Sequence, residues 1–157
     1  MARQDEVALW LATATLKADG QEIAALDTEG LMADIEAGKD LDTSLEEMRR
    51  FDRKGGDFGA EIIGPLLIPI VVEAAKQLWA TYLKELTEQG GKQLAILTID
   101  AVKAAVGRLW SDKPDLPTRY AALIRAEAER QGLAADQVER LVQTVKSPLL
   151  TEEITAP

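Results

Sequence analysis

The sequence of 157 residues contains no cysteine and no histidine. Without cysteine there is no disulfide, no thiolate ligand and no thiol nucleophile. Without histidine, Ser-His-Asp and Cys-His catalysis and His-ligated metals are excluded, together with the usual side chain for proton transfer near neutral pH. Carboxylate and lysine chemistry are not excluded. We therefore expect a protein that is not an enzyme, we expect no cofactor, and we name no catalytic, cofactor-binding or metal-ligating residue.

Aromatic residues are also scarce, at 4%, although hydrophobic residues make up 46% of the chain. The core must therefore consist mainly of Leu, Ile, Val and Ala. Alanine and leucine have high helix propensity, whereas strands favour aromatic and β-branched residues. The composition predicts an all-α protein.

Basic residues are outnumbered, and the net charge of −9 is unevenly distributed. Residues 1–60 hold 7 Lys/Arg and 14 Asp/Glu, residues 61–110 hold 5 of each, and residues 111–157 hold 6 and 8. An acidic chain repels nucleic acid phosphates, so nucleic acid is disfavoured as a partner. The same charge repels anionic lipid, but the middle third is neutral.

No long hydrophobic run is present. The longest apolar stretch without a charge, Ile62–Val72, has 11 residues and is too short to span a membrane as a helix. Asp5 and Glu6 stand where a signal peptide requires positive charge. We therefore expect a cytoplasmic protein.

The stretch from Glu61 to Trp110 predicts a central helical hairpin. Two helices of about 20 residues, 69–89 and 92–110, are expected to run antiparallel from a turn at Gly90-Gly91. Neither proline in this stretch suits a helix interior, so Ile62–Ile68 is predicted to be a buried approach to the first helix, either irregular or a single turn. The second helix is apolar on two sides, which predicts that it forms the axis of the bundle.

The acidic region 1–57 predicts short helices. Apolar residues at helical spacing, glycine stops and capping residues indicate three of them: residues 5–18, ending before Gly20; a helix capped by Asp27 or Thr28, ending at Gly38; and a helix capped by Thr43 or Ser44.

The C-terminal part, after a turn at Ser111–Thr118, predicts a second helix pair within 117–146. Its helices are expected at 117–131 and 136–146. Residues 148–157 are expected to be a loose tail, with docking through Leu149, Leu150 and Ile154 as the alternative. The whole pattern predicts a single helical domain, 1–147, with the approach and hairpin at 58–110. It should form a compact bundle of about six to seven helices around that hairpin.

Short motifs that resemble known sites do not meet their chemical requirements. In the stretch beginning Asp40-Leu41-Asp42, Leu45 occupies the glycine position of a calcium loop. Gly90-Gly91-Lys92 lacks the Ser/Thr of a phosphate loop. The acidic pairs Asp34/Glu36 and Glu46/Glu47 do not fix a ligand number, so solvated charge is the simpler interpretation.

Arg49–Lys54 is the only basic cluster in the sequence. Its cations can offset the helix dipole at the end of a helix. The alternative interpretation is an anion site for a phosphate, a lipid headgroup or an acidic partner. The sequence does not decide between them.

Two functions from different classes are compatible with these patterns. The first is a non-enzymatic helical interaction or assembly module, which presents an acidic surface to a protein partner or to further copies of itself. The alternative is a membrane-active, pore-forming or membrane-perturbing protein that releases the 62–110 hairpin into a bilayer. Charged residues within the hairpin oppose insertion, because each charge at the bilayer centre costs about 3 kcal/mol.

Overall fold

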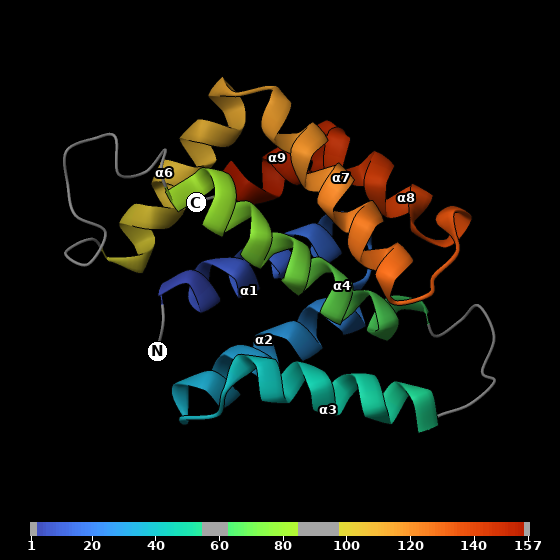
Figure 1. Ribbon diagram of the computed structural model, residues 1–157. Helices are drawn as coiled ribbons and strands as arrows, with labels where there is room; N and C mark the ends of the chain where they lie inside the picture. Colours follow the sequence, from blue (N-terminus) through green and yellow to red (C-terminus); the bar gives the residue numbers. More distant parts are fainter. Residues whose placement is uncertain (1–2, 55–62, 85–97, 156–157) are drawn as a thin grey trace.

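The computed structural model describes residues 3–54, 63–84 and 98–155, and within these ranges almost every residue is helical (Figure 1). The described elements are eight α-helices and one π-helical segment: α1 (Arg3–Ala18), α2 (Glu22–Glu36), α3 (Leu41–Lys54), α4 (Ile63–Leu78), η2 (Trp79–Leu83), α6 (Ile99–Asp112), α7 (Asp115–Arg130), α8 (Ala135–Lys146) and α9 (Pro148–Thr155). The predicted all-α bundle is confirmed.

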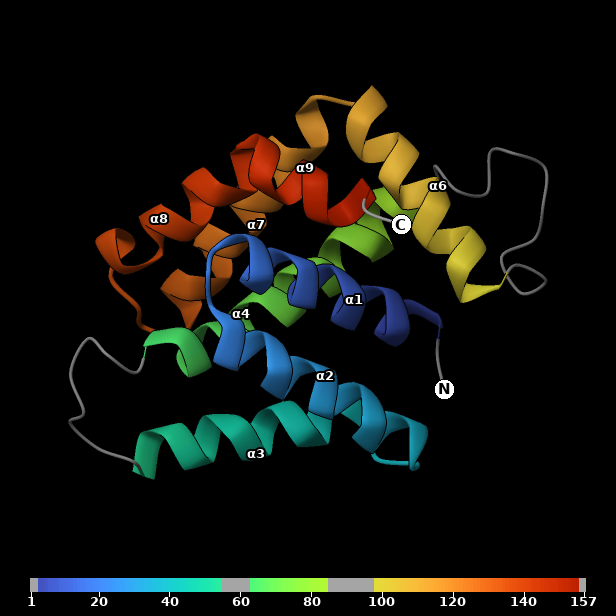
Figure 2. The same cartoon turned by 180° about the vertical axis from the view of Figure 1, so that it is seen from behind.

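Helix α4 lies at the centre of this bundle. It packs against α1, α7, α2 and α3, and Figures 1 and 2 show α2 and α3 on one side of it and α7 and α8 on the other. Its side chains from Leu67 to Leu78 are buried, apart from the partly exposed Glu73, Lys76 and Gln77. The centre of the core is therefore aliphatic, as the composition predicts.

Helix α4 begins at Ile63, so the predicted irregular approach at Ile62–Ile68 is wrong over its described residues, and Pro69 lies inside the helix. An internal proline removes one backbone hydrogen bond and costs about 3 kcal/mol. Burial of a large aliphatic side chain contributes about 1.5–3 kcal/mol. Leu67, Ile70 and Val71 are all at most 2% exposed, so their burial outweighs the cost of Pro69.

The predicted pairing of 69–89 with 92–110 is not confirmed, and its turn at Gly90-Gly91 lies outside the described residues. Within the described ranges, α6 packs mainly on α9 and α1, whereas α4 packs on α1, α7, α2 and α3. In α6, Val102, Val106 and Trp110 are buried, but Ala101 is exposed. The prediction that the second helix forms the axis of the bundle is therefore wrong over its described residues. Alanines offer little apolar area to bury, and α4 lies at the centre instead.

The N-terminal helices follow the predicted order but not the predicted caps. Helix α2 begins at Glu22, so neither Asp27 nor Thr28 is its cap. Thr28 is an interior residue whose hydroxyl donates to the Ala24 carbonyl over 2.8 Å. Asp40 caps α3 in place of Thr43 or Ser44, because its carboxylate accepts a hydrogen bond of 3.1 Å from the Thr43 backbone N–H.

The corner between α1 and α2 turns at Gly20, as predicted. Gly20 has a φ of 76°, a conformation that costs glycine nothing, and the Gln21 N–H donates to the Leu16 carbonyl over 2.8 Å. The preceding residue, Asp19, joins this corner to α8. Its carboxylate accepts a hydrogen bond of 2.8 Å from Thr144, and Arg140 donates to its carbonyl over 2.7 Å. The start of α2 is thus held firmly against the bundle.

The C-terminal part contains more helix than the sequence predicts. Helix α7 begins at Asp115, within the predicted turn, and α8 matches its prediction closely. The predicted loose tail is wrong over its described residues, because residues 148–155 form α9, which packs on α1, α6 and α8. Leu150 is fully buried and Ile154 is 4% exposed. These two side chains, four positions apart, supply enough apolar surface to dock a helix of eight residues.

Candidate interaction surface

Helix α2 presents an apolar stripe to solvent along its outer face. Ile23 is 74% exposed and Leu26 is 64% exposed, and with Leu149 they are the large hydrophobic side chains most accessible in the described chain. The stripe continues with three small exposed residues: Gly30, Ala33 and Ala37. The spacing of these positions alternates between three and four residues, which is the spacing of the seam positions in a coiled coil.

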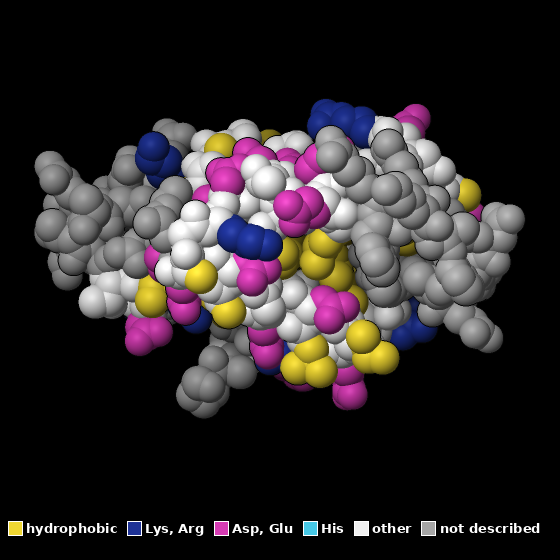
Figure 3. Space-filling view, turned by 90° about the horizontal axis from the view of Figure 1, so that it is seen from below, with side chains coloured by type: hydrophobic (Ala, Val, Ile, Leu, Met, Phe, Trp, Pro, Cys, Tyr) yellow, Lys and Arg dark blue, Asp and Glu magenta, His cyan; other side chains and the backbone are white. Residues whose placement is uncertain are grey.

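Acidic side chains border this stripe on both sides. By helical geometry, Asp27 and Asp34 lie along one edge, and Glu22, Glu29 and Glu36 lie along the other. Helix α2 contains no lysine or arginine. Among the described side chains, one of these five carboxylates forms an ion pair: Glu29 contacts Lys17 at 3.1 Å. Figure 3 shows acidic side chains spread over the underside of the molecule, around hydrophobic ones.

The inner face of α2 is part of the core, so the position of the outer face is fixed. Ala24, Ala25, Thr28, Leu31 and Ile35 are all buried, and α2 packs against α1, α4 and α3. The exposed stripe and the buried stripe are therefore opposite faces of one well-anchored helix. Sequence analysis missed the outer stripe because a pattern with two apolar faces does not show which face meets the bundle.

Gly30 lies on the outer stripe, in the interior of α2. Its backbone is not in the left-handed region, and a Cβ atom placed on it would meet nothing within 4 Å. Neither the backbone conformation nor the internal packing requires glycine here. Glycine in a helix interior costs about 0.5–1 kcal/mol relative to alanine, so the fold alone does not account for Gly30.

We expect Gly30→Ala to raise the free energy of unfolding by about 0.5–1 kcal/mol, equivalent to a Tm increase of about 1–4 °C. The cause is the lower conformational entropy of alanine in the unfolded chain. Gly38→Ala is the matched control, because Gly38 has a φ of 102° and alanine there should lower Tm. Thermal unfolding followed by circular dichroism measures both. A lower Tm for Gly30→Ala would contradict the open space and the unstrained backbone found at Gly30.

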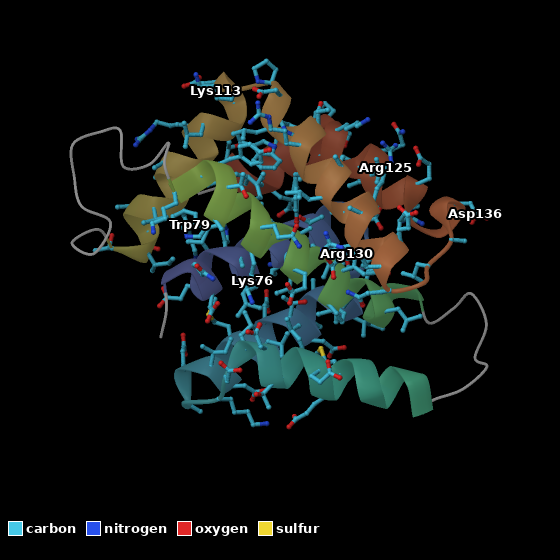
Figure 4. The ribbon with its side chains drawn as sticks, viewed as in Figure 1. Lys76, Trp79, Lys113, Arg125, Arg130 and Asp136 are labelled. Atoms are coloured by element: carbon cyan, nitrogen blue, oxygen red, sulfur yellow. The ribbon has the colours of Figure 1, made fainter. Side chains whose placement is uncertain are left out.

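A cluster of charged side chains surrounds Lys76, which lies on the side of α4 that faces α3 (Figure 4). Its ammonium group contacts the Asp42 carboxylate at 2.6 Å. Burial raises the pKa of nearby Asp5 above its ordinary value of 3.8; Lys76 opposes this shift, and Asp42 and Asp40 add to it. Burial acts to lower the pKa of Lys76, but its hydrogen bond to Asp42 and its acidic neighbours outweigh burial, so that pKa is raised. The cluster joins three helices, α1, α3 and α4.

The raised pKa of Asp5 predicts a pH-dependent effect of Asp5→Asn. A carboxyl whose pKa is higher in the folded state favours folding below its unfolded pKa and disfavours it as pH rises. The variant and the parent should therefore have similar Tm values below about pH 3.8, and the variant should become the more stable of the two towards pH 7. Asp136→Asn is the control, since Asp136 is exposed and also lies in the first turn of its helix. Equal Tm values for Asp5→Asn and the parent at pH 7 would contradict this prediction.

A groove of about 740 Å³ lies between α6 and α9 and is bordered by Trp10. Lys103 lies over the Trp10 ring, 5.9 Å from its centroid, and charges of both signs line the groove. The groove is open to solvent, and its mixed charge selects no ligand class.

The sites considered from sequence do not assemble into a reactive centre. Within the described residues no three acidic side chains are placed to hold a metal ion. Asp34 and Glu36 lie on opposite edges of the α2 stripe, and Glu46 and Glu47 lie on the exposed surface of α3. The backbone of Arg49–Lys54 forms the last turns of α3, but its side chains lie outside the described part of the structure.

Among the described residues, one segment, Leu66–Leu83, is long and apolar enough to cross a membrane, and 61% of it is buried in the bundle. A core helix of a soluble protein has the same properties.

Comparison with protein-family models, curated proteins and solved structures gave no significant match. The described helices place this protein in the class of all-α helical bundles.

Proposed function

We propose that this protein is a non-enzymatic interaction module that binds a protein partner through the outer face of α2. The observation that carries the proposal is the continuous stripe that begins with Ile23 and Leu26, at 74% and 64% exposure. Single exposed hydrophobic side chains are common on protein surfaces. A stripe in seam spacing along a whole helix is instead typical of a helix that packs against a further helix.

The size of this face indicates a modest interface. Helix α2 is about 22 Å long at 1.5 Å per residue, and it offers two large and three small apolar residues. Such a surface is smaller than that of a permanent complex, which buries about 2,000 Å² or more. The partner is therefore expected to bind reversibly.

Site-specific photo-crosslinking in the native host tests this function. A photoreactive residue at Ala33 of α2 is compared with one at Ala122 of α7, because both are exposed alanines within helices. We expect a discrete adduct with a protein from position 33 and none from position 122. Identical products from both positions, or no adduct from position 33, would contradict the proposal.

The membrane-active alternative depends on Leu66–Leu83, which is apolar and long enough to span a bilayer. Its release would expose side chains that now form the core, including Ile70 and Leu78. Glu73 and Lys76 would also enter the bilayer, at a cost of about 3 kcal/mol each. Leakage of dye from liposomes treated with the folded protein would favour this alternative, and intact liposomes would argue against it.

A further inference from the structure

We infer that the occupant of the α2 face is a helix with basic flanks from a different protein, and not a second copy of this chain. This inference rests on the function proposed above and specifies its partner. It follows from the order of charged and apolar residues around α2.

The outer half of α2 follows the heptad pattern of a coiled coil. Ile23, Gly30 and Ala37 occupy a positions, and Leu26 and Ala33 occupy d positions. All flanking positions are acidic, with Asp27 and Asp34 at e and Glu22, Glu29 and Glu36 at g. The b, c and f positions are the buried or partly buried residues that pack on the bundle. Helix α2 therefore has one seam free for a further helix.

Charge at the flanks excludes a second copy as the favoured occupant. In a two-helix pair, the e and g side chains of one helix face those of the other and determine which partner and orientation are accepted. Two copies of α2 would bring acidic side chains together in either a parallel or an antiparallel pair. Like charges facing each other oppose association, whereas lysine or arginine at the partner's flanks favours it. Among the described side chains, Glu29 is the one flanking carboxylate that forms an ion pair, with Lys17.

The small residues of the stripe indicate the size of the apolar side chains that the partner helix should carry. Space above Gly30 is open, and Ala33 and Ala37 follow at the next seam positions. Small residues at a helix contact allow close approach, and bulky side chains of the opposite helix fill the space above them. The partner helix is thus expected to present leucine-sized residues opposite Gly30 and Ala33. This requirement gives Gly30 a role that the fold itself does not provide.

The test uses synthetic helical peptides of three heptads as probes. One peptide has leucine at a and d and lysine at e and g; a second has glutamate at e and g; a third has the composition of the first in scrambled order. We expect the lysine-flanked peptide to bind at least tenfold more tightly than either control, by fluorescence anisotropy at physiological salt. Its affinity should fall as salt is added, because the flanking charges are exposed.

Two protein variants locate the binding and reverse its preference. Leu26→Asp places a charge in the seam at an exposed position, so the fold is retained, and binding of the lysine-flanked peptide should fall at least tenfold. The combined variant Glu22→Lys, Asp27→Lys, Asp34→Lys and Glu36→Lys should instead prefer the glutamate-flanked peptide. Circular dichroism confirms that each variant is folded.

Several results would overturn the inference. Equal binding of the two flanked peptides would reject charge selection but leave α2 as the interaction surface. Binding that is unaffected by Leu26→Asp would place the peptide elsewhere. Dimers of the parent chain in sedimentation velocity that dissociate with Leu26→Asp would make a second copy the occupant. If no peptide binds, the inference fails, and crosslinking from Ala33 decides separately whether the proposed function survives.

Discussion

Leu150→Ala is expected to lower the free energy of unfolding by about 2–5 kcal/mol. Leu150 is fully buried where α9 packs against α1, α6 and α8. Its truncation removes buried apolar contacts and leaves a cavity that the surrounding helices fill only in part. A protein of this size is stable by about 5–15 kcal/mol, so one substitution near the C-terminus should remove a large fraction of the total.

The neighbouring residue supplies the matched control. Leu149 is 53% exposed, so Leu149→Ala should change the free energy of unfolding by about 0.5 kcal/mol or less. Urea unfolding followed by far-UV circular dichroism measures both variants. Equal and small effects would show that α9 does not dock through Leu150, and the interpretation of residues 148–157 as a loose tail would then be right.

Trp79→Ala is expected to cost about 3–5 kcal/mol of unfolding free energy. Trp79 is 1% exposed and is among the largest buried side chains of the described chain. It begins η2, where the Lys84 N–H donates to the Trp79 carbonyl in the wider π-helical turn. Because η2 packs against α1 as well as continuing α4, loss of the indole is expected to weaken the packing of this segment against α1.

Thr81→Ala in the same π-helical segment is the control, because Thr81 is exposed. It should alter the free energy of unfolding by less than about 1 kcal/mol. Far-UV circular dichroism is the appropriate signal for both, since the chain has three tryptophans and fluorescence would change with Trp79 itself. A loss below about 1 kcal/mol for Trp79→Ala would place Trp79 outside the core.

Helices were predicted correctly where apolar residues recur at helical spacing and a residue that ends a helix follows them. Residues 5–18 and 136–146 became α1 and α8, and α1 ends before Gly20 as expected. Local information suffices in these cases, because glycine reaches a positive φ without strain and one apolar face is sufficient to anchor a helix.

Predictions failed where packing outweighed a local preference. Pro69 indicates a helix start, but burial of the residues around it extends α4 back to Ile63. Thr28 has the chemistry of a cap, but its hydroxyl bonds to the Ala24 carbonyl inside α2. Residues 148–155 are too few to form a stable helix alone, and α9 forms because Leu150 and Ile154 find an apolar site on the bundle.

For the candidate surface on α2, too, the local sequence and the tertiary packing determine different features. The sequence by itself determined an acidic, cysteine-free and histidine-free all-α chain, because composition and helical period are local properties. It also contained the alternation of Ile23, Leu26 and Gly30 with acidic residues. Only the tertiary structure decided that Leu31 and Ile35 face inward while Ile23 and Leu26 face solvent. A helix with two apolar faces can bury either one, and the neighbouring helices α1 and α4 determine which face remains free.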